Sequence, residues 1–73
     1  MIKEGEMMIH PFGSKVPFRI LEVRDDYYTY QYTNNDAIFS GMLDVLYQDL
    51  RYGIARRYHE YMNDLTLKSM FKE

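Results

Sequence analysis

The chain has 73 residues, with nine basic and eleven acidic side chains and a net charge of −2. Its length supports one small domain over residues 1–73, and its nearly balanced charge lacks the basic excess of a typical nucleic-acid-binding domain. It has no cysteine, which excludes disulfides and thiolate zinc sites. No apolar run reaches the roughly 20 residues that span a bilayer, and residues 1–6 lack the features of a signal peptide. We therefore expect a cytoplasmic protein without membrane contact.

The first 33 residues predict a short antiparallel sheet that follows a loose N-terminus at 1–6. The apolar run at 7–10 suits one short strand, which Pro11 ends. Residues 16–33 are rich in β-branched and aromatic side chains on both sides of Asp25 and Asp26, which is typical of a β-hairpin with the two aspartates in its turn. Because a lone hairpin is marginal in water, we expect residues 7–10 to join it as a third strand, so that the sheet spans residues 7–33.

A turn at the two aspartates also predicts the hairpin register and its faces. The expected opposite pairs are Arg24 with Tyr27, Glu22 with Thr29, and Ile20 with Gln31. Since side chains alternate between the faces of a strand, one face is more apolar and is expected to pack on the core. That face carries Leu21, Val23, Tyr28, Tyr30 and Tyr32. Phe18 and Ile20 then lie on the opposite face, where they need a cover from the C-terminal segment, a second copy of the chain or a partner protein.

The stretch 35–67 predicts helix. Asn34, Asn35 and Asp36 offer side chains that can cap a helix N-terminus. Apolar residues follow at steps of three and four, namely Phe39, Leu43, Leu46, Leu50, Ile54, Tyr58, Tyr61 and Leu65. At Gly53 the apolar stripe rotates by roughly a third of a turn, so the chain either breaks there into two helices or docks one helix on two surfaces. Residues 68–73 form a short amphipathic tail.

These elements together predict an α+β fold. It consists of a short antiparallel sheet, made of a hairpin at 16–33 and a strand near 7–10, followed by one long or two shorter C-terminal helices. Closure of the sheet into a small SH3-like barrel with a helical extension is one arrangement of these elements.

The polar side chains do not form a recognisable catalytic or metal-binding motif. His10 and His59 are far apart in sequence, and neither belongs to a metal-ligand pattern. Adjacent aspartates at a hairpin tip suit turn formation better than acid–base catalysis, which needs a desolvated carboxyl group. None of the serines lies in a nucleophile elbow. We predict that the protein is not an enzyme and uses no cofactor or metal.

A group of arginines and tyrosines suggests one alternative function. Arg51, Arg56 and Arg57 lie close in sequence beside Tyr52 and Tyr58, and arginine with tyrosine can contact phosphates and stack on bases. At helical spacing, however, the three arginines point in different directions and build no single stripe. Nucleic-acid binding is therefore the alternative hypothesis.

The favoured hypothesis is a small non-enzymatic protein-binding module that acts as an inhibitor or regulator by occupying the surface of a partner protein. It rests on the surplus of apolar side chains for so short a chain, which a homodimer would also bury. Accessory proteins of phages and mobile elements are a natural class for a chain of this size. The predicted partner-binding residues are Phe18, Ile20, Tyr52, Arg56, Arg57, Tyr58, Tyr61 and Leu65.

Overall fold

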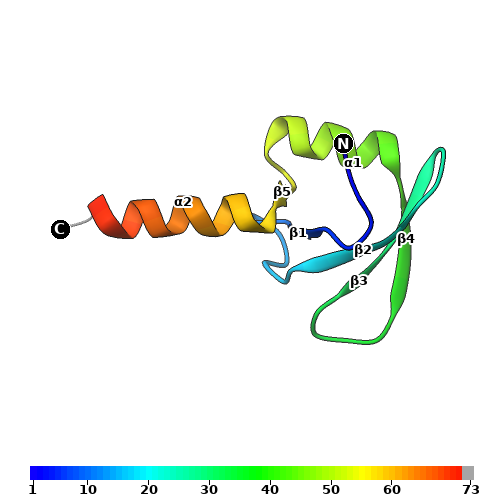
Figure 1. Ribbon diagram of the computed structural model, residues 1–73, viewed down its shortest axis with the longest axis horizontal. Coiled ribbons are helices and arrows are strands. Elements are labelled where there is room, and N and C mark those ends of the chain that lie inside the picture. Colours follow the sequence, from blue (N-terminus) through cyan, green and yellow to red (C-terminus); the bar gives the residue numbers. More distant parts are fainter. Residues whose placement is uncertain (72–73) are drawn as a thin grey trace.

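The computed structural model describes residues 1–71, which form an α+β fold with a five-stranded antiparallel sheet and two helices (Figure 1). This confirms the predicted fold class. The strands are β1 (Met7–Ile9), β2 (Phe18–Val23), β3 (Tyr27–Tyr32), β4 (Ile38–Met42) and β5 (Arg56–Arg57), and the helices are α1 (Leu43–Tyr52) and α2 (Tyr58–Phe71).

The sheet is open. Its strand order is β4-β3-β2-β1-β5, and within residues 1–71 the outer strands β4 and β5 each pair with one neighbour. The suggested closure into an SH3-like barrel therefore does not occur in this part of the chain. The predicted hairpin and the strand near 7–10 are present as β2, β3 and β1, but the sheet has two strands more than expected.

A β-bulge at Leu21 changes which residues of β2 face the core. Next to the turn the predicted register is right: the Arg24 N–H donates to the Tyr27 carbonyl at 2.9 Å, and Glu22 lies opposite Thr29. Between Ile20 and Glu22 the register shifts, so that Ile20 pairs with Tyr30 instead of Gln31. One extra residue in a strand moves every residue beyond it to the other face.

The bulge places Phe18 and Ile20 in the core, on the same face of the sheet as Tyr28, Tyr30 and Tyr32 of β3. Both side chains are fully buried, together with Met8 of β1 and Leu46 of α1. The Phe18 ring packs against Tyr30, with ring centroids 5.1 Å apart. The prediction that Phe18 and Ile20 need a cover from a tail, a second copy or a partner was wrong, since the chain itself covers them.

Residues 38–42 form a strand where helix was predicted. The side chain of Asn35 accepts a hydrogen bond from the Ala37 N–H at 2.9 Å, so it stabilises the turn between β3 and β4 instead of capping a helix. β4 then pairs with the tyrosine-rich β3, and Gly41 lies opposite Tyr28. The helix begins only at Leu43, because the strand pairing outcompetes the helical spacing of this stretch.

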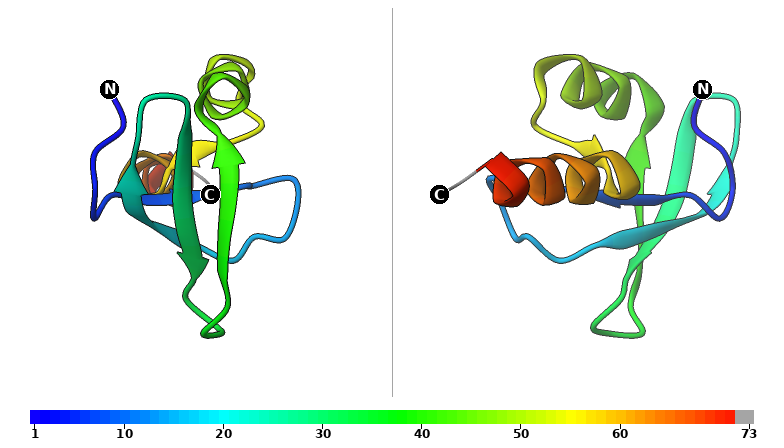
Figure 2. Two further views of the ribbon diagram at one scale, coloured as in Figure 1. Left: turned by 90° about the vertical axis from the view of Figure 1, so that its right-hand side faces the viewer. Right: turned by 60° about the vertical axis from the view of Figure 1, so that its left-hand side comes forward.

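Gly53 ends α1, so the stretch 35–67 breaks at this residue. Gly53 adopts a left-handed conformation with φ of 79°, and its N–H donates to the Leu50 carbonyl, which is a common helix ending. The chain then adds β5 to the sheet and continues as α2, which projects beyond the sheet (Figures 1 and 2). Helix α2 includes the first part of the predicted tail at 68–73, whereas Lys72 and Glu73 lie outside the described residues.

The N-terminus packs against the sheet instead of being loose. Ile2 is only 4% exposed and belongs to the core. The Gly5 N–H donates to the Ile20 carbonyl at 2.7 Å, and the Ile20 N–H donates to the Glu6 carbonyl at 2.8 Å. These bonds use backbone groups of β2 beside the bulge. None of the helices in residues 1–71 is long and apolar enough to span a bilayer.

Candidate functional site

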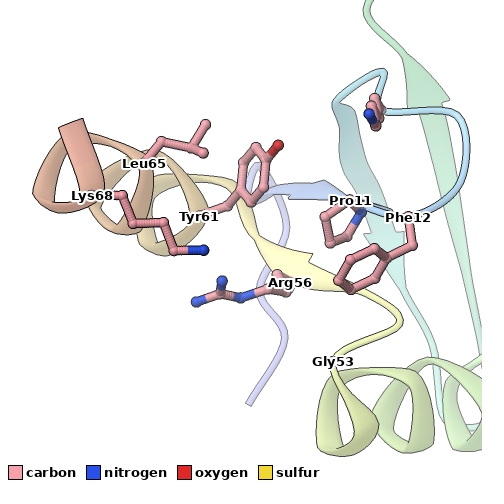
Figure 3. Close-up of a pocket in the computed structure, with 8 residues that line it drawn as sticks. Pro11, Phe12, Gly53, Arg56, Tyr61, Leu65 and Lys68 are labelled. Carbon is pink, nitrogen blue, oxygen red and sulfur yellow. The ribbon is translucent and has the colours of Figure 1, made fainter. Parts of the chain in front are cut away.

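A groove lies between the loop after β1 and the first turns of α2 (Figure 3). Its volume is about 670 Å³, which is within the range of ligand pockets. Figure 3 shows Tyr61, Leu65 and Lys68 on one side, Pro11 and Phe12 on the other, and Arg56 between them. The lining residues are Pro11, Phe12, Lys15, Gly53, Arg56, Tyr61, Leu65 and Lys68.

The loop holds Phe12 out in solvent. Pro11 is buried, and the N–H groups of Gly13 and Lys15 both donate to the His10 carbonyl, at 3.0 and 3.2 Å. These two bonds turn the chain tightly, and Lys15 adopts a left-handed φ of 60°. As a result the Phe12 side chain is 90% exposed at the edge of the groove. A fully exposed aromatic ring on a constrained loop is a typical anchor for a protein partner.

Helix α2 supplies the opposite wall. Tyr61, Leu65 and Lys68 follow one another at steps of four and three, so they share one face of the helix. This face offers a half-buried tyrosine, an exposed leucine and a lysine in succession. The wall therefore combines apolar contact area with a positive charge at its far end.

Arg56 lies on β5 between the two walls, and its charge is partly neutralised. Its Nη2 atom donates to the Oδ2 atom of Asp64, which lies on α2. The ion pair connects β5 to the helix, and both side chains remain partly exposed. Arg56 is therefore already paired with a carboxylate at this position.

A second hollow adjoins the first and shares Phe12 with it. Its volume is about 370 Å³, and Ile54, an exposed residue beside Gly53, contributes another apolar side chain. Phe12 is therefore a ridge between two hollows rather than an isolated exposed residue. The other lining residues are His10, Gly13, Ser14 and Tyr32.

Arg57 does not line the groove and has a structural role. Its Nε atom donates to Glu6 Oε2 at 2.6 Å, and both side chains are largely buried. Burial alone would raise the pKa of the Glu6 carboxyl, but the Lys3 N–H and the Arg57 guanidinium both donate to it and lower that pKa below its ordinary value. The pair ties the N-terminal segment to β5.

The groove gathers three of the predicted partner-binding residues, Arg56, Tyr61 and Leu65. Tyr52, which is 72% exposed at the end of α1, does not line it, and neither does the half-buried Tyr58. The remaining three are used inside the chain: Phe18 and Ile20 in the core, and Arg57 in its ion pair.

The predicted arginine cluster for nucleic acid does not assemble. Arg51 is exposed on α1, whereas Arg56 and Arg57 bind the carboxylates of Asp64 and Glu6. An arginine that is already paired with a carboxylate must give up that partner before it can hold a phosphate. This arrangement weakens the alternative hypothesis.

Sequence reasoning missed Phe12, Lys15 and Lys68. The signal for Phe12 is its position between Pro11 and Gly13, because a large aromatic in such a short turn has little chance of reaching the core. The two lysines line one groove only through the fold, since they lie 53 positions apart in the chain (68 − 15).

The described residues offer no evident site for a metal ion, since residues 1–71 contain no group of three or more His, Asp or Glu side chains placed to hold one. The chemistry that the groove does offer is an apolar surface with basic groups along it, which suits binding. No protein-family model and no curated protein matches the chain.

Proposed function

We propose that the protein is a non-enzymatic binding module that acts as an inhibitor or regulator by occupying the surface of a partner protein. The observation that carries the proposal is Phe12, a large aromatic side chain held 90% exposed by a constrained loop at the edge of a groove. Exposed aromatics next to well-formed hollows are enriched among the residues that dominate protein–protein binding energies.

The chemistry of the groove indicates what the partner presents. Tyr61 and Leu65 favour an apolar side chain in the groove, next to the Phe12 ring. Lys15 and Lys68 favour carboxylates on either side of that apolar group, and they attract an acidic segment during association. The expected ligand is therefore a protein segment with one large apolar residue and flanking acidic residues.

The direct test is affinity capture from cells of the source organism with the tagged protein, with and without nuclease. We expect one protein to be captured both with and without nuclease. Its capture should weaken as salt is added, because the lysines contribute to binding. Phe12→Ala should lower the affinity of the captured partner by roughly 30-fold, the effect of truncating an aromatic residue worth about 2 kcal/mol. Val45→Ala is the matched control, since Val45 is an exposed apolar residue on α1 that does not line the groove.

Two results would contradict the proposal. Capture that disappears on nuclease treatment and is lost in an Arg51→Ala variant would favour nucleic-acid binding. A captured protein whose affinity is unchanged by both Phe12→Ala and Leu65→Ala would place the binding surface elsewhere on the molecule.

A further inference from the structure

The two edges of the open sheet differ in how they are protected. Edge strands expose unpaired backbone N–H and C=O groups, which invite pairing with another strand unless charge, proline or short length prevents it. β5 is two residues long, and both are arginines engaged in ion pairs. β4 is five residues long, contains neither a charged residue nor a proline, and has only β3 beside it within residues 1–71 (Figure 2).

The side chains of β4 are also unusually apolar for an exposed strand. Ile38 is 63% exposed and Met42 is 61% exposed, both on the face that points away from the core residue Tyr28. Tyr27, which pairs with Met42, is exposed as well. A patch of this kind marks an interaction surface on a small domain.

The sequence of β4 fits a second copy of itself. In an antiparallel pair centred on Ser40, each Ser40 lies opposite the other and Ile38 lies opposite Met42 of the second copy. The same register places Phe39 opposite Gly41 of the second copy, where it can pack beside the Tyr28 ring that covers this glycine. Registers shifted by two residues in either direction leave part of the strand unpaired, so this register alone pairs all five residues.

We propose that two copies of the chain pair through β4 to form a symmetric dimer with a continuous ten-stranded sheet (2 × 5 strands). The interface is isologous, so the β4 edges of both chains pair with each other and assembly ends at two chains. The residues of β4 do not line the groove. Helix α2, which forms one wall of the groove, lies at the opposite end of the molecule from β4 (Figure 1). The dimer therefore leaves both grooves open, and this inference stands independently of the proposed function.

The first experiment is sedimentation of the purified protein from micromolar to millimolar concentration, for the natural sequence and for Ser40→Lys and Ser40→Glu. We expect a dimer for the natural sequence and monomers for each variant alone, because the symmetric register places two like charges directly opposite each other. An equimolar mixture of the two variants should restore the dimer. Circular dichroism shows whether each variant is folded.

Cysteine cross-linking tests the register. Because the natural chain has no cysteine, any disulfide must form through the introduced residue. Ser40→Cys should oxidise to a covalent dimer, since directly opposite residues are within disulfide reach. Ile38→Cys is the matched control on the same strand. In this register the two copies of residue 38 are roughly 13 Å apart and cannot bridge.

A protein that stays monomeric over the whole concentration range would overturn the inference. So would a dimer that persists in both charged variants, or one in which Ile38→Cys cross-links as readily as Ser40→Cys. Mutation of the groove through Phe12→Ala should leave the dimer unchanged, which separates failure of this interface from failure of the proposed function.

Discussion

At the scale of single residues, Tyr28 and Gly41 form a matched pair across β3 and β4. The Tyr28 ring lies directly over Gly41, so that a Cβ atom added at this glycine would be 3.0 Å from the ring and its hydroxyl. Tyr28 is itself almost completely buried. The absence of a side chain at residue 41 is therefore what allows a tyrosine to enter the core at this position.

Replacing Gly41 by alanine should destabilise the fold. The new methyl group pushes against a buried ring, and overpacking of this kind costs about 1–3 kcal/mol. Urea unfolding measured against Ser40→Ala, a change at an exposed neighbour on the same strand, checks this prediction. An unfolding free energy equal to that of the natural sequence would mean that the Tyr28 ring moves aside at no cost.

Tyr28 should also make stability fall at alkaline pH. Burial raises the pKa of the Tyr28 hydroxyl to about 12 from an ordinary value of 10.0. The unfolded chain therefore releases this proton at lower pH than the folded chain does. The stabilisation is complete below pH 10 and is lost as the pH rises from 10 toward 12.

The measurement for this prediction is the free energy of unfolding across that alkaline range. Tyr28→Phe should flatten the decline relative to the natural sequence, and Tyr52→Phe, at an exposed tyrosine, should not. An equally steep decline in Tyr28→Phe would assign the effect to other ionising groups.

At the scale of elements, the ion pair of Glu6 and Arg57 joins the N-terminal segment to β5. The distance between Arg57 Nε and Glu6 Oε2 is 2.6 Å, and the pKa of the Glu6 carboxyl is lowered. A lowered pKa means that the stabilisation is present above the ordinary value of 4.5 and is lost as the pH falls below it.

Glu6→Gln should therefore reduce the free energy of unfolding at neutral pH and have little effect in strong acid. The amide cannot carry the charge that Arg57 needs, and removing one partner of a largely buried pair leaves the other uncompensated. Thermal unfolding followed from neutral to acid pH measures both effects. Glu22→Gln is the control, because Glu22 pairs with Arg24 at an exposed position. A constant difference between Glu6→Gln and the natural sequence at every pH would contradict the assigned ionisation.

At the scale of the whole molecule, α2 extends away from the sheet. It contacts β1 and β5 near its start (Figure 1), and Leu67 and Met70 farther along are exposed. The body of the domain has its core between the sheet and α1, and none of residues 58–70 of α2 belongs to the buried cluster. Residues 65–70 of α2 are exposed and are therefore expected to contribute little to folding.

A chain that ends after Thr66 should fold with nearly unchanged stability. Residues 67–70 are exposed, and loss of exposed residues usually changes the free energy of unfolding by about 0.5 kcal/mol or less. The same truncation removes Lys68 from the groove. It should therefore weaken binding of the captured partner and make that binding less dependent on salt concentration. Denaturant unfolding and a binding titration of the truncated chain check the two halves of this prediction. A strongly destabilised truncation would show that the end of α2 supports the fold.

Sequence reasoning reached part of this structure. The turn at Asp25 and Asp26, the strand near 7–10 and the change at Gly53 depend on nearby residues, so local patterns revealed them. The helix predicted from residue 35 was wrong up to Met42, because the spacing of Phe39 and its neighbours suits a helix as well as a strand. Of the candidate site, Tyr61 and Leu65 were predicted from their helical spacing and Arg56 from its place in the group of arginines and tyrosines, whereas Phe12 was not predicted.

The sequence by itself determined the α+β class, the hairpin and the position of the change at Gly53, since each depends on turn residues and on apolar spacing within a few positions. It left open whether the chain breaks at Gly53 or continues as one helix, and the tertiary structure shows that it breaks. The tertiary structure alone decided which side chains face the core and which distant segments contact each other. One extra residue at Leu21 moved Phe18 and Ile20 from the predicted surface into the core. The ion pair of Arg57 with Glu6 and the placement of Lys15 and Lys68 on one groove involve residues that are distant in the chain, and β4 pairs with β3 although its own spacing also suits a helix. Such contacts depend on competition between alternative pairings of the whole chain, which no local pattern records.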